Sequence, residues 1–235
     1  AEAATLEQIS GTSVSDNYSA TVSLTPTTTG NLIVVCAQTG QASTSITDNK
    51  ANTYFQAASI NNGNAYVKLY YAYNAAGGVT SITTNYSAWS SFARIVAAEY
   101  KGFGNSDPVD KTVSSLNGYK AGSSWTSGTM QNTTDPNELL IGCVAEMYGA
   151  NTVFTSGSDF NSRRTQGSLF LQDFQTTTGN FSSSGTHNLT TGYNFGSLLA
   201  GFKISDINTP TPTPTPAPTP VPTTTPTTTT TTTPI

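Results

Sequence analysis

Charged side chains are scarce in this sequence. Only 9% of its 235 residues are Asp, Glu, Lys or Arg, with nine basic residues against thirteen acidic ones and a formal net charge of -4. The lysines stand singly, so no basic patch is present that would hold a phosphate backbone. We therefore expect no nucleic-acid partner.

Long apolar runs are missing as well. No stretch approaches the roughly 20 apolar residues that a membrane-spanning helix needs, so we expect no membrane span. The N-terminal AEAATLEQ lacks a basic region followed by an apolar one, and we interpret it as a mature end left after signal removal. Few charges combined with abundant Ser, Thr, Asn and Gly favour an extracellular or cell-surface location.

The pattern of the remaining residues predicts an all-β fold. Short runs rich in β-branched and aromatic residues alternate with turn formers, and no stretch keeps a 3.6-residue period for three turns. Residues 1–208 are enough for one large domain with a buried core. The expected strands are 19–25, 31–38, 53–60, 65–74, 79–86, 92–100, 138–146, 168–175, 186–191 and 196–204.

Two segments of the chain resemble each other. NLIVVCAQ (31–38) matches ELLIGCVAE (138–146), and each is followed by a long strand, a Gly-containing turn, a Ser/Thr-rich strand and an apolar closing strand. We interpret this as an internal pseudo-duplication with halves at about 15–104 and 121–205. Each half would supply four or five strands to one shared core, in an antiparallel, jelly-roll-like β-sandwich.

The two cysteines occupy matching places in these segments. Cys36 and Cys143 are each the sixth residue of an apolar run. Thiols oxidise in an extracellular compartment, so we expect a disulfide between the paired central strands. The alternative is a pair of buried free thiols that act as small hydrophobic side chains.

Few residues qualify as catalytic groups. His187, the sole histidine, has no serine elbow or acid at triad spacing, and we expect it in a solvated loop or at a strand edge. Glu99 and Glu146 each close an apolar strand, and two carboxylates are what glycoside hydrolysis requires. A glutamate at a strand end is usually turning toward water, however, and we expect no catalysis from either, hence no enzyme.

Acidic residues in two turns raise the question of calcium. Asp48 lies in TDNKANTY, and Asp107 and Asp110 lie in NSDPVD. Their oxygens are the ligands that Ca²⁺ prefers. Neither stretch has the spacing of an EF-hand loop, and Asp in turns more often serves the turn itself, so we expect no cofactor and keep calcium as the weaker alternative.

Aromatic side chains are better candidates for binding. In AYVKLYYAY the alternation places Val67, Leu69 and Tyr71 on one face and Lys68 between two tyrosines on the other. Tyrosines on a flat strand surface, and tryptophans in Ser/Gly-rich loops, can stack on sugar rings. The alternative for the tryptophans is that they cover the ends of the sandwich. The glycan-binding candidates are Tyr66, Tyr70, Trp89 and Trp125.

Residues 209–235 have a composition of their own. They contain fifteen threonines and nine of the twelve prolines of the chain, with no charged residue, aromatic residue or glycine. Such a segment cannot build a core and favours extended polyproline II, the composition of O-glycosylated stalks. A plain linker to another domain is the alternative. The candidates for O-glycosylation are Thr209, Thr211, Thr213, Thr215, Thr219, Thr223, Thr224, Thr225, Thr227, Thr228, Thr229, Thr230, Thr231, Thr232 and Thr233.

Three blocks of the sequence resemble a known module. ITDNKANTYFQAA, LYYAYNAAGGVTSITTNYS and ARIVAAEYKGFGNSDPVD are similar to blocks of an uncharacterised β-sandwich module of large secreted and surface-attached bacterial proteins. The likeness covers residues 31–113 well and the second half loosely, and Lys50-Ala51 stand where the module prefers a small residue followed by Gly. The shared positions are turn and core positions. The resemblance implies extracellular display, with adhesion or glycan binding.

These observations leave two main functional hypotheses. The first is a non-enzymatic structural or adhesive surface protein, including a self-assembling filament subunit whose partners are copies of itself, with a glycosylated stalk. The second is a carbohydrate-binding module that recognises cell-surface glycans and is tethered by a Thr/Pro linker to a glycoside hydrolase.

Overall fold

The computed structural model describes residues 3–204, except 43, 121–123, 134 and 190–192. The Thr/Pro segment 209–235 and its fifteen candidate threonines lie outside the described residues. Within the described part, the chain forms sixteen strands and no helix, and every ladder between neighbouring strands is antiparallel. The expected all-β, antiparallel fold class is confirmed.

The strands fall into two sets of eight along the chain. The first set is β1 (Thr5–Val14), β2 (Asn17–Ser23), β3 (Leu32–Thr39), β4 (Thr44–Asp48), β5 (Phe55–Asn61), β6 (Tyr66–Ala72), β7 (Ser81–Ser90) and β8 (Ala93–Lys101). The second set is β9 (Val109–Lys120), β10 (Ser124–Thr126), β11 (Glu138–Glu146), β12 (Phe154–Ser156), β13 (Asn161–Gln166), β14 (Leu169–Thr176), β15 (Ser184–His187) and β16 (Tyr193–Lys203).

The two sets have the same strand order. The first set forms a five-stranded sheet, β1-β8-β3-β6-β5, and a three-stranded sheet, β2-β7-β4. The second set forms the sheets β9-β16-β11-β14-β13 and β10-β15-β12, so adding eight to each number of the first set reproduces the second. The boundary between the sets falls between β8 and β9.

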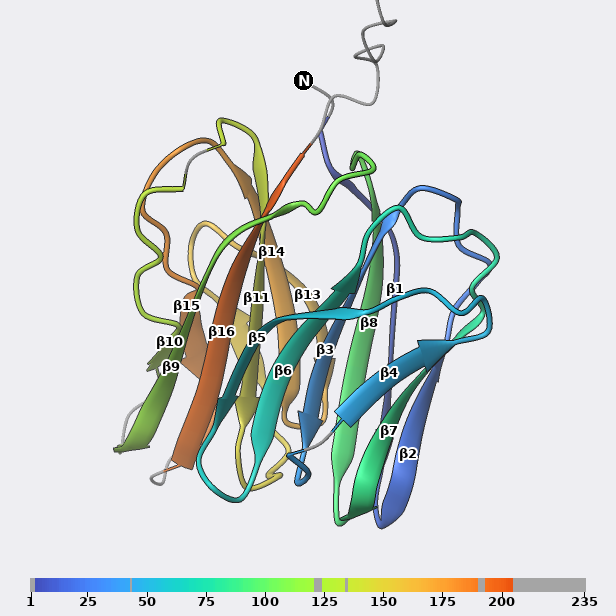
Figure 1. Ribbon diagram of the computed structural model, residues 1–235. Helices are drawn as coiled ribbons and strands as arrows, with labels where there is room; N and C mark the ends of the chain where they lie inside the picture. Colours follow the sequence, from blue (N-terminus) through green and yellow to red (C-terminus); the bar gives the residue numbers. More distant parts are fainter. Residues whose placement is uncertain (1–2, 43, 121–123, 134, 190–192, 205–235) are drawn as a thin grey trace, which may run out of the picture.

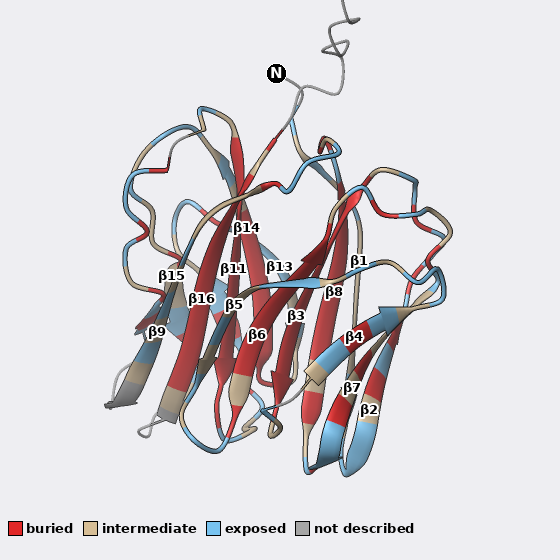
Figure 2. Cartoon of the chain, viewed as in Figure 1, coloured by how far each residue is buried: buried red, intermediate tan, exposed pale blue. Residues whose placement is uncertain are grey.

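The four sheets are stacked in layers (Figure 1). The two five-stranded sheets face each other across a central core to which both contribute, and the β2-β7-β4 and β10-β15-β12 sheets pack on their outer faces. The central strands β3 and β11 are covered on both sides and are buried along their whole length (Figure 2). This explains why their sequences are continuously apolar rather than alternating. The expectation of four or five strands per half around one core was wrong, because each half also encloses an apolar layer of its own.

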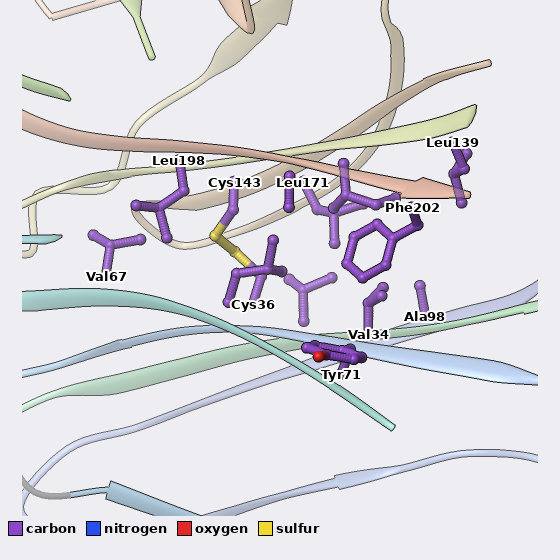
Figure 3. Packing of buried hydrophobic residues seen from close by; sticks show 14 of the residues in the cluster. Val34, Cys36, Val67, Tyr71, Ala98, Leu139, Cys143, Leu171, Leu198 and Phe202 are labelled. Atoms are coloured by element: carbon purple, nitrogen blue, oxygen red, sulfur yellow. A yellow bond between two sulfur atoms is a disulfide. The ribbon is translucent and has the colours of Figure 1, made fainter. Parts of the chain in front are cut away.

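A disulfide crosses the central core. Cys36 and Cys143 are fully buried, lie 6.1 Å apart at their Cα atoms and are bonded to each other (Figure 3). Their strands, β3 and β11, are not neighbours in one sheet but lie in the two facing sheets. The pairing agrees with the sequence prediction, and it joins the halves through equivalent positions of their central strands.

Contacts beside the disulfide follow an approximate two-fold relation. By strand register, Tyr100 corresponds to Phe202, and Tyr71 corresponds to Asp173. Tyr100 Oη donates a buried hydrogen bond of 2.8 Å to Asp173 Oδ2, and the Phe202 ring meets the Tyr71 ring edge-on at 5.6 Å. Equivalent positions therefore meet in both directions, as in a two-fold interface between two identical subunits.

Candidate functional site

The Glu99 carboxylate ties down the N-terminal part of the first half. Its Oε1 accepts hydrogen bonds of 2.7 Å from the Thr28 amide and from Asn31 Nδ2, and its Oε2 accepts one of 2.7 Å from Gln8 Nε2. The side chain is buried, so the expectation that this strand-end glutamate faces water was wrong. Three donors from β1 and from the segment between β2 and β3 replace water around the carboxylate.

The Glu146 carboxylate has a comparable role in the second half. It accepts hydrogen bonds from the backbone amides of Tyr148, at 2.7 Å, and Ala150, at 2.6 Å. Burial raises the pKa of Glu146, while these backbone bonds and the nearby Arg94 guanidinium act in the opposite direction. Glu146 is fully buried, so the expectation of solvent exposure was wrong here too. The carboxylate fixes the turn that follows β11.

The two glutamates lie at opposite ends of the sandwich. Glu99 pairs with Ile33 near the start of β3, whereas the Glu146 carbonyl accepts a hydrogen bond from Gln38 near the end of the same strand. Five residues of strand separate these levels by roughly 17 Å. Paired carboxyl groups in glycosidases lie about 5 to 9.5 Å apart, so this pair cannot flank one glycosidic bond.

The single histidine belongs to the interior. His187 is only 8% exposed, and its ring stacks on Phe195 with centroids 4.2 Å apart. Its Nδ1 accepts a hydrogen bond of 3.2 Å from the Leu189 amide, and burial lowers its pKa. The expectation of a solvated position was wrong, because β15 is the middle strand of its sheet and the His187 ring is covered by Phe195 of β16.

The tyrosines of β6 do not form an exposed binding face. The alternation itself is confirmed, because Tyr71 packs in the central core and Tyr70 in the outer layer of the first half. Tyr70 is 6% exposed, and its hydroxyl donates a 3.3 Å hydrogen bond to the Thr44 carbonyl of β4, while burial raises its pKa to about 12. Tyr66, at the start of β6, is half-buried, with Lys68 Nζ 5.4 Å from its ring centroid. The sequence could not show that a second sheet covers this face.

The two tryptophans have opposite environments. Trp125 is 2% exposed and contacts Phe154 and Phe170 edge-on, so it is a core residue and cannot stack on a sugar. Trp89 is 51% exposed near the end of β7. Tyr18, 62% exposed, lies on the adjacent strand β2, in the irregular part of the ladder opposite residues 86–89. The sequence does not mark Tyr18 as a binding residue, because its neighbours in SDNYSA are polar and small residues common in loops.

The calcium candidates have protein partners. Asp48 accepts hydrogen bonds from the backbone and side chain of Asn52 and from the Tyr54 hydroxyl, which orders the turn after β4. Asp107 accepts from the Tyr71 hydroxyl at 2.9 Å, and Asp110 lies 3.7 Å from Lys203 Nζ. Among the residues that the structure describes, no three His, Cys, Asp or Glu side chains gather in a metal-binding group.

Glu138, the first residue of β11, has an environment that the sequence does not reveal. Glu138 is fully buried, and its pKa is raised from 4.5 to about 7. Burial is the largest cause, and the Asp110 carboxyl group adds to it through a hydrogen bond and through its charge. As an ionised carboxylate, Glu138 leaves its Oε2 without a hydrogen-bond partner. Protonation of either carboxyl group would supply a donor between them.

Comparison with protein-family models, curated proteins and solved structures finds no match to this chain. In the described part of the chain, no helix is long and apolar enough to cross a membrane.

Proposed function

We propose that this chain is a non-enzymatic structural protein of the extracellular surface, which assembles with copies of itself into filaments. The main support for the proposal is that two buried glutamates of this chain bind loops of the protein itself. Glu99 and Glu146, which could have served catalysis, each hold a loop in place at opposite ends of the body. The interior polar groups thus contribute to rigidity.

The arrangement of the two halves supports the same proposal. Each half has the strand order of a jelly roll in which one strand has moved to the edge of the larger sheet. We infer that the halves arose by duplication of such a unit. A disulfide between their central strands, across 107 residues of chain, resists separation of the halves under load. This suits a body that transmits force along an assembly.

The segment 209–235 completes the proposal as a glycosylated stalk. Extended Thr-Pro sequence leaves its hydroxyls accessible to a transferase, and O-glycans would stiffen it and shield it from proteases. The resemblance of residues 31–113 to a bacterial surface module favours the same extracellular setting. The peptide that contains residues 209–235, from natively produced protein, should carry a ladder of sugar masses. A single unmodified mass would show that this segment is a plain linker.

Glycan binding is the second candidate function, and one observation favours it. Trp89 and Tyr18 are large aromatic side chains, both more than half exposed, on adjacent strands. Such neighbours can stack on a sugar ring. A carbohydrate-binding module would use this pair rather than the buried Tyr70 and Trp125.

Two assays separate the candidates. Sedimentation velocity of natively produced protein should show assemblies far larger than the 24.5 kDa chain. Depletion assays on insoluble polysaccharides should show no binding that depends on Trp89, with Trp89→Ala compared with the matched, less exposed variant Tyr66→Ala. A monomer whose polysaccharide binding falls at least tenfold in Trp89→Ala, and not in Tyr66→Ala, would replace the first proposal by the second.

A further inference from the structure

Three ionisable side chains meet at one end of the β9-β16-β11 sheet. Glu138 of β11 and Lys203 of β16 are directly paired, and β9, which carries Asp110, is the other neighbour of β16. The residues next to Glu138 and Lys203, Leu139 and Phe202, point into the central core, so Glu138 and Lys203 point to the opposite face. The three side chains therefore share the outer face of three adjacent strands.

A glycine and a β-bulge make room for this arrangement. Between Phe202 and Ala200 the register of β9 shifts by one residue, which places residues 110–111 opposite Gly201. A Cβ atom added at Gly201 would lie only 2.7 Å from Glu138 Oε2 and 3.4 Å from side-chain atoms of Leu140 and Met130. The carboxyl group of Glu138 thus occupies the space over Gly201 and can reach the Asp110 side chain on the far side of β16.

The surroundings suit a reaction between an amine and a carboxyl group. Lys203 Nζ lies 3.7 Å from Asp110 Oδ1, and the Asp110 side chain is only 6% exposed. Glu138 is fully buried beside it, with Oε2 lacking a partner when ionised and with a pKa of about 7 that keeps a proton available near neutral pH. The Lys203 side chain is 40% exposed, which leaves a path to solvent for a departing water molecule.

We propose that Lys203 Nζ and Asp110 Cγ are joined by an isopeptide bond, and that Glu138 relays the proton that its formation requires. The three groups that amide condensation needs, an amine, a carboxyl group and a neutral acid, are held together by neighbouring strands. Holding reactants in contact replaces an unfavourable bimolecular condensation in water by an intramolecular one.

The step balances without any other reactant. The Lys203 ammonium gives one proton to the Asp110 carboxylate, and the resulting amine attacks Cγ to form a tetrahedral intermediate. Glu138 donates its proton to the departing hydroxyl, which leaves as water while the C=O bond re-forms. The nitrogen returns one proton to Glu138, so an ammonium and a carboxylate become an amide and water, and Glu138 ends as it began.

Such a bond would fix the end of β16 to β9 covalently. β16 ends at Lys203, and in sequence the Thr/Pro segment 209–235 follows it closely. A pull applied through that segment would then reach β9 through a covalent bond instead of through backbone hydrogen bonds alone. The bond is independent of the proposed filament, since it forms within one chain.

Peptide and intact masses test the proposal. The full chain, with its disulfide intact and from a host that adds no O-glycans, should weigh one water, about 18 Da, less than its disulfide-bonded sequence mass. Trypsin should not cut after Lys203, and digestion should release a branched peptide that joins the segment containing Asp110 to the segment containing Lys203. Glu138→Gln and Lys203→Arg should each restore the full mass and leave the circular-dichroism spectrum of the fold unchanged.

Lys101 provides a matched control, because by register it is the equivalent of Lys203 in the first half and is exposed. Lys101→Arg should keep the mass deficit. A wild-type chain of full mass that trypsin cuts after Lys203 would show an ordinary ion pair and overturn the proposal. A deficit that persists in Lys203→Arg would place the lost water elsewhere, and one that persists in Glu138→Gln would remove the relay role.

Discussion

Removing the central disulfide should strongly destabilise the protein. The bond joins residues 107 apart in sequence. On the chain-entropy model, its loss raises the conformational entropy of the unfolded chain, which stabilises the unfolded state by about 4.8 kcal/mol. Cys36 and Cys143 are fully buried, so replacing both by Ala also leaves a small cavity, worth on the order of 1 kcal/mol. We expect the double variant Cys36→Ala/Cys143→Ala to lose about 4–6 kcal/mol in its free energy of unfolding.

Guanidinium unfolding, followed by tryptophan fluorescence, measures this loss. Trp125 is buried and should report the transition. The m-value of the double variant should exceed that of the oxidised protein, because an unfolded chain without the cross-link exposes more surface. The reduced wild type is the control and should unfold close to the double variant. A loss below about 1 kcal/mol with an unchanged m-value would refute the view that the disulfide locks the two halves together.

Three further predictions follow from the buried polar and aromatic residues. In Lys203→Arg, which keeps the Asp110 carboxyl group, burial and that carboxyl raise the folded pKa of Glu138 from 4.5 to about 7, so its contribution to stability is present below pH 4.5 and is lost as the pH rises through 7, by as much as about 3 kcal/mol; pH-dependent urea unfolding should show this slope flattened when Glu138→Gln is added. Trp125→Ala should cost about 3–5 kcal/mol in thermal or urea unfolding, whereas Trp89→Ala should stay within about 0.5 kcal/mol; equal effects would contradict their assigned environments. Glu99→Gln should lower the free energy of unfolding by about 1–3 kcal/mol, because the new side-chain amide places an N–H donor against a donor that now faces a carboxylate oxygen. An unchanged free energy of unfolding would show that Glu99 does not hold this part of the chain in place.

The strands that sequence could identify are those whose signal is local. β3 and β11 were evident because both of their faces are buried, which makes them continuously apolar. β13 was missed because NSRRTQ is largely exposed and has no apolar face. β1 was missed as well, although its Leu6 and Ile9 pack against the central core, since TLEQISGTSV alternates too weakly. The run at 186–191 was only partly correct, because β15 ends at His187.

The environments of the candidate site residues depended on contacts far away in sequence. The donors that surround Glu99 come from residues 8, 28 and 31, and no pattern near position 99 announces them. Trp125 has Ser and Gly neighbours typical of a loop, but Phe154 and Phe170 enclose it. The cysteine pairing could be predicted because the repeated pattern placed both residues at equivalent points, and a two-fold relation brings such points together at its axis.

Electron microscopy of natively produced particles tests the central claim most directly. A rigid, disulfide-locked body that assembles with copies of itself should appear as regular filaments, with the sixteen-stranded body as the repeating unit. The account would be contradicted if the native protein, at the concentrations at which its source displays it, appeared only as dispersed single particles.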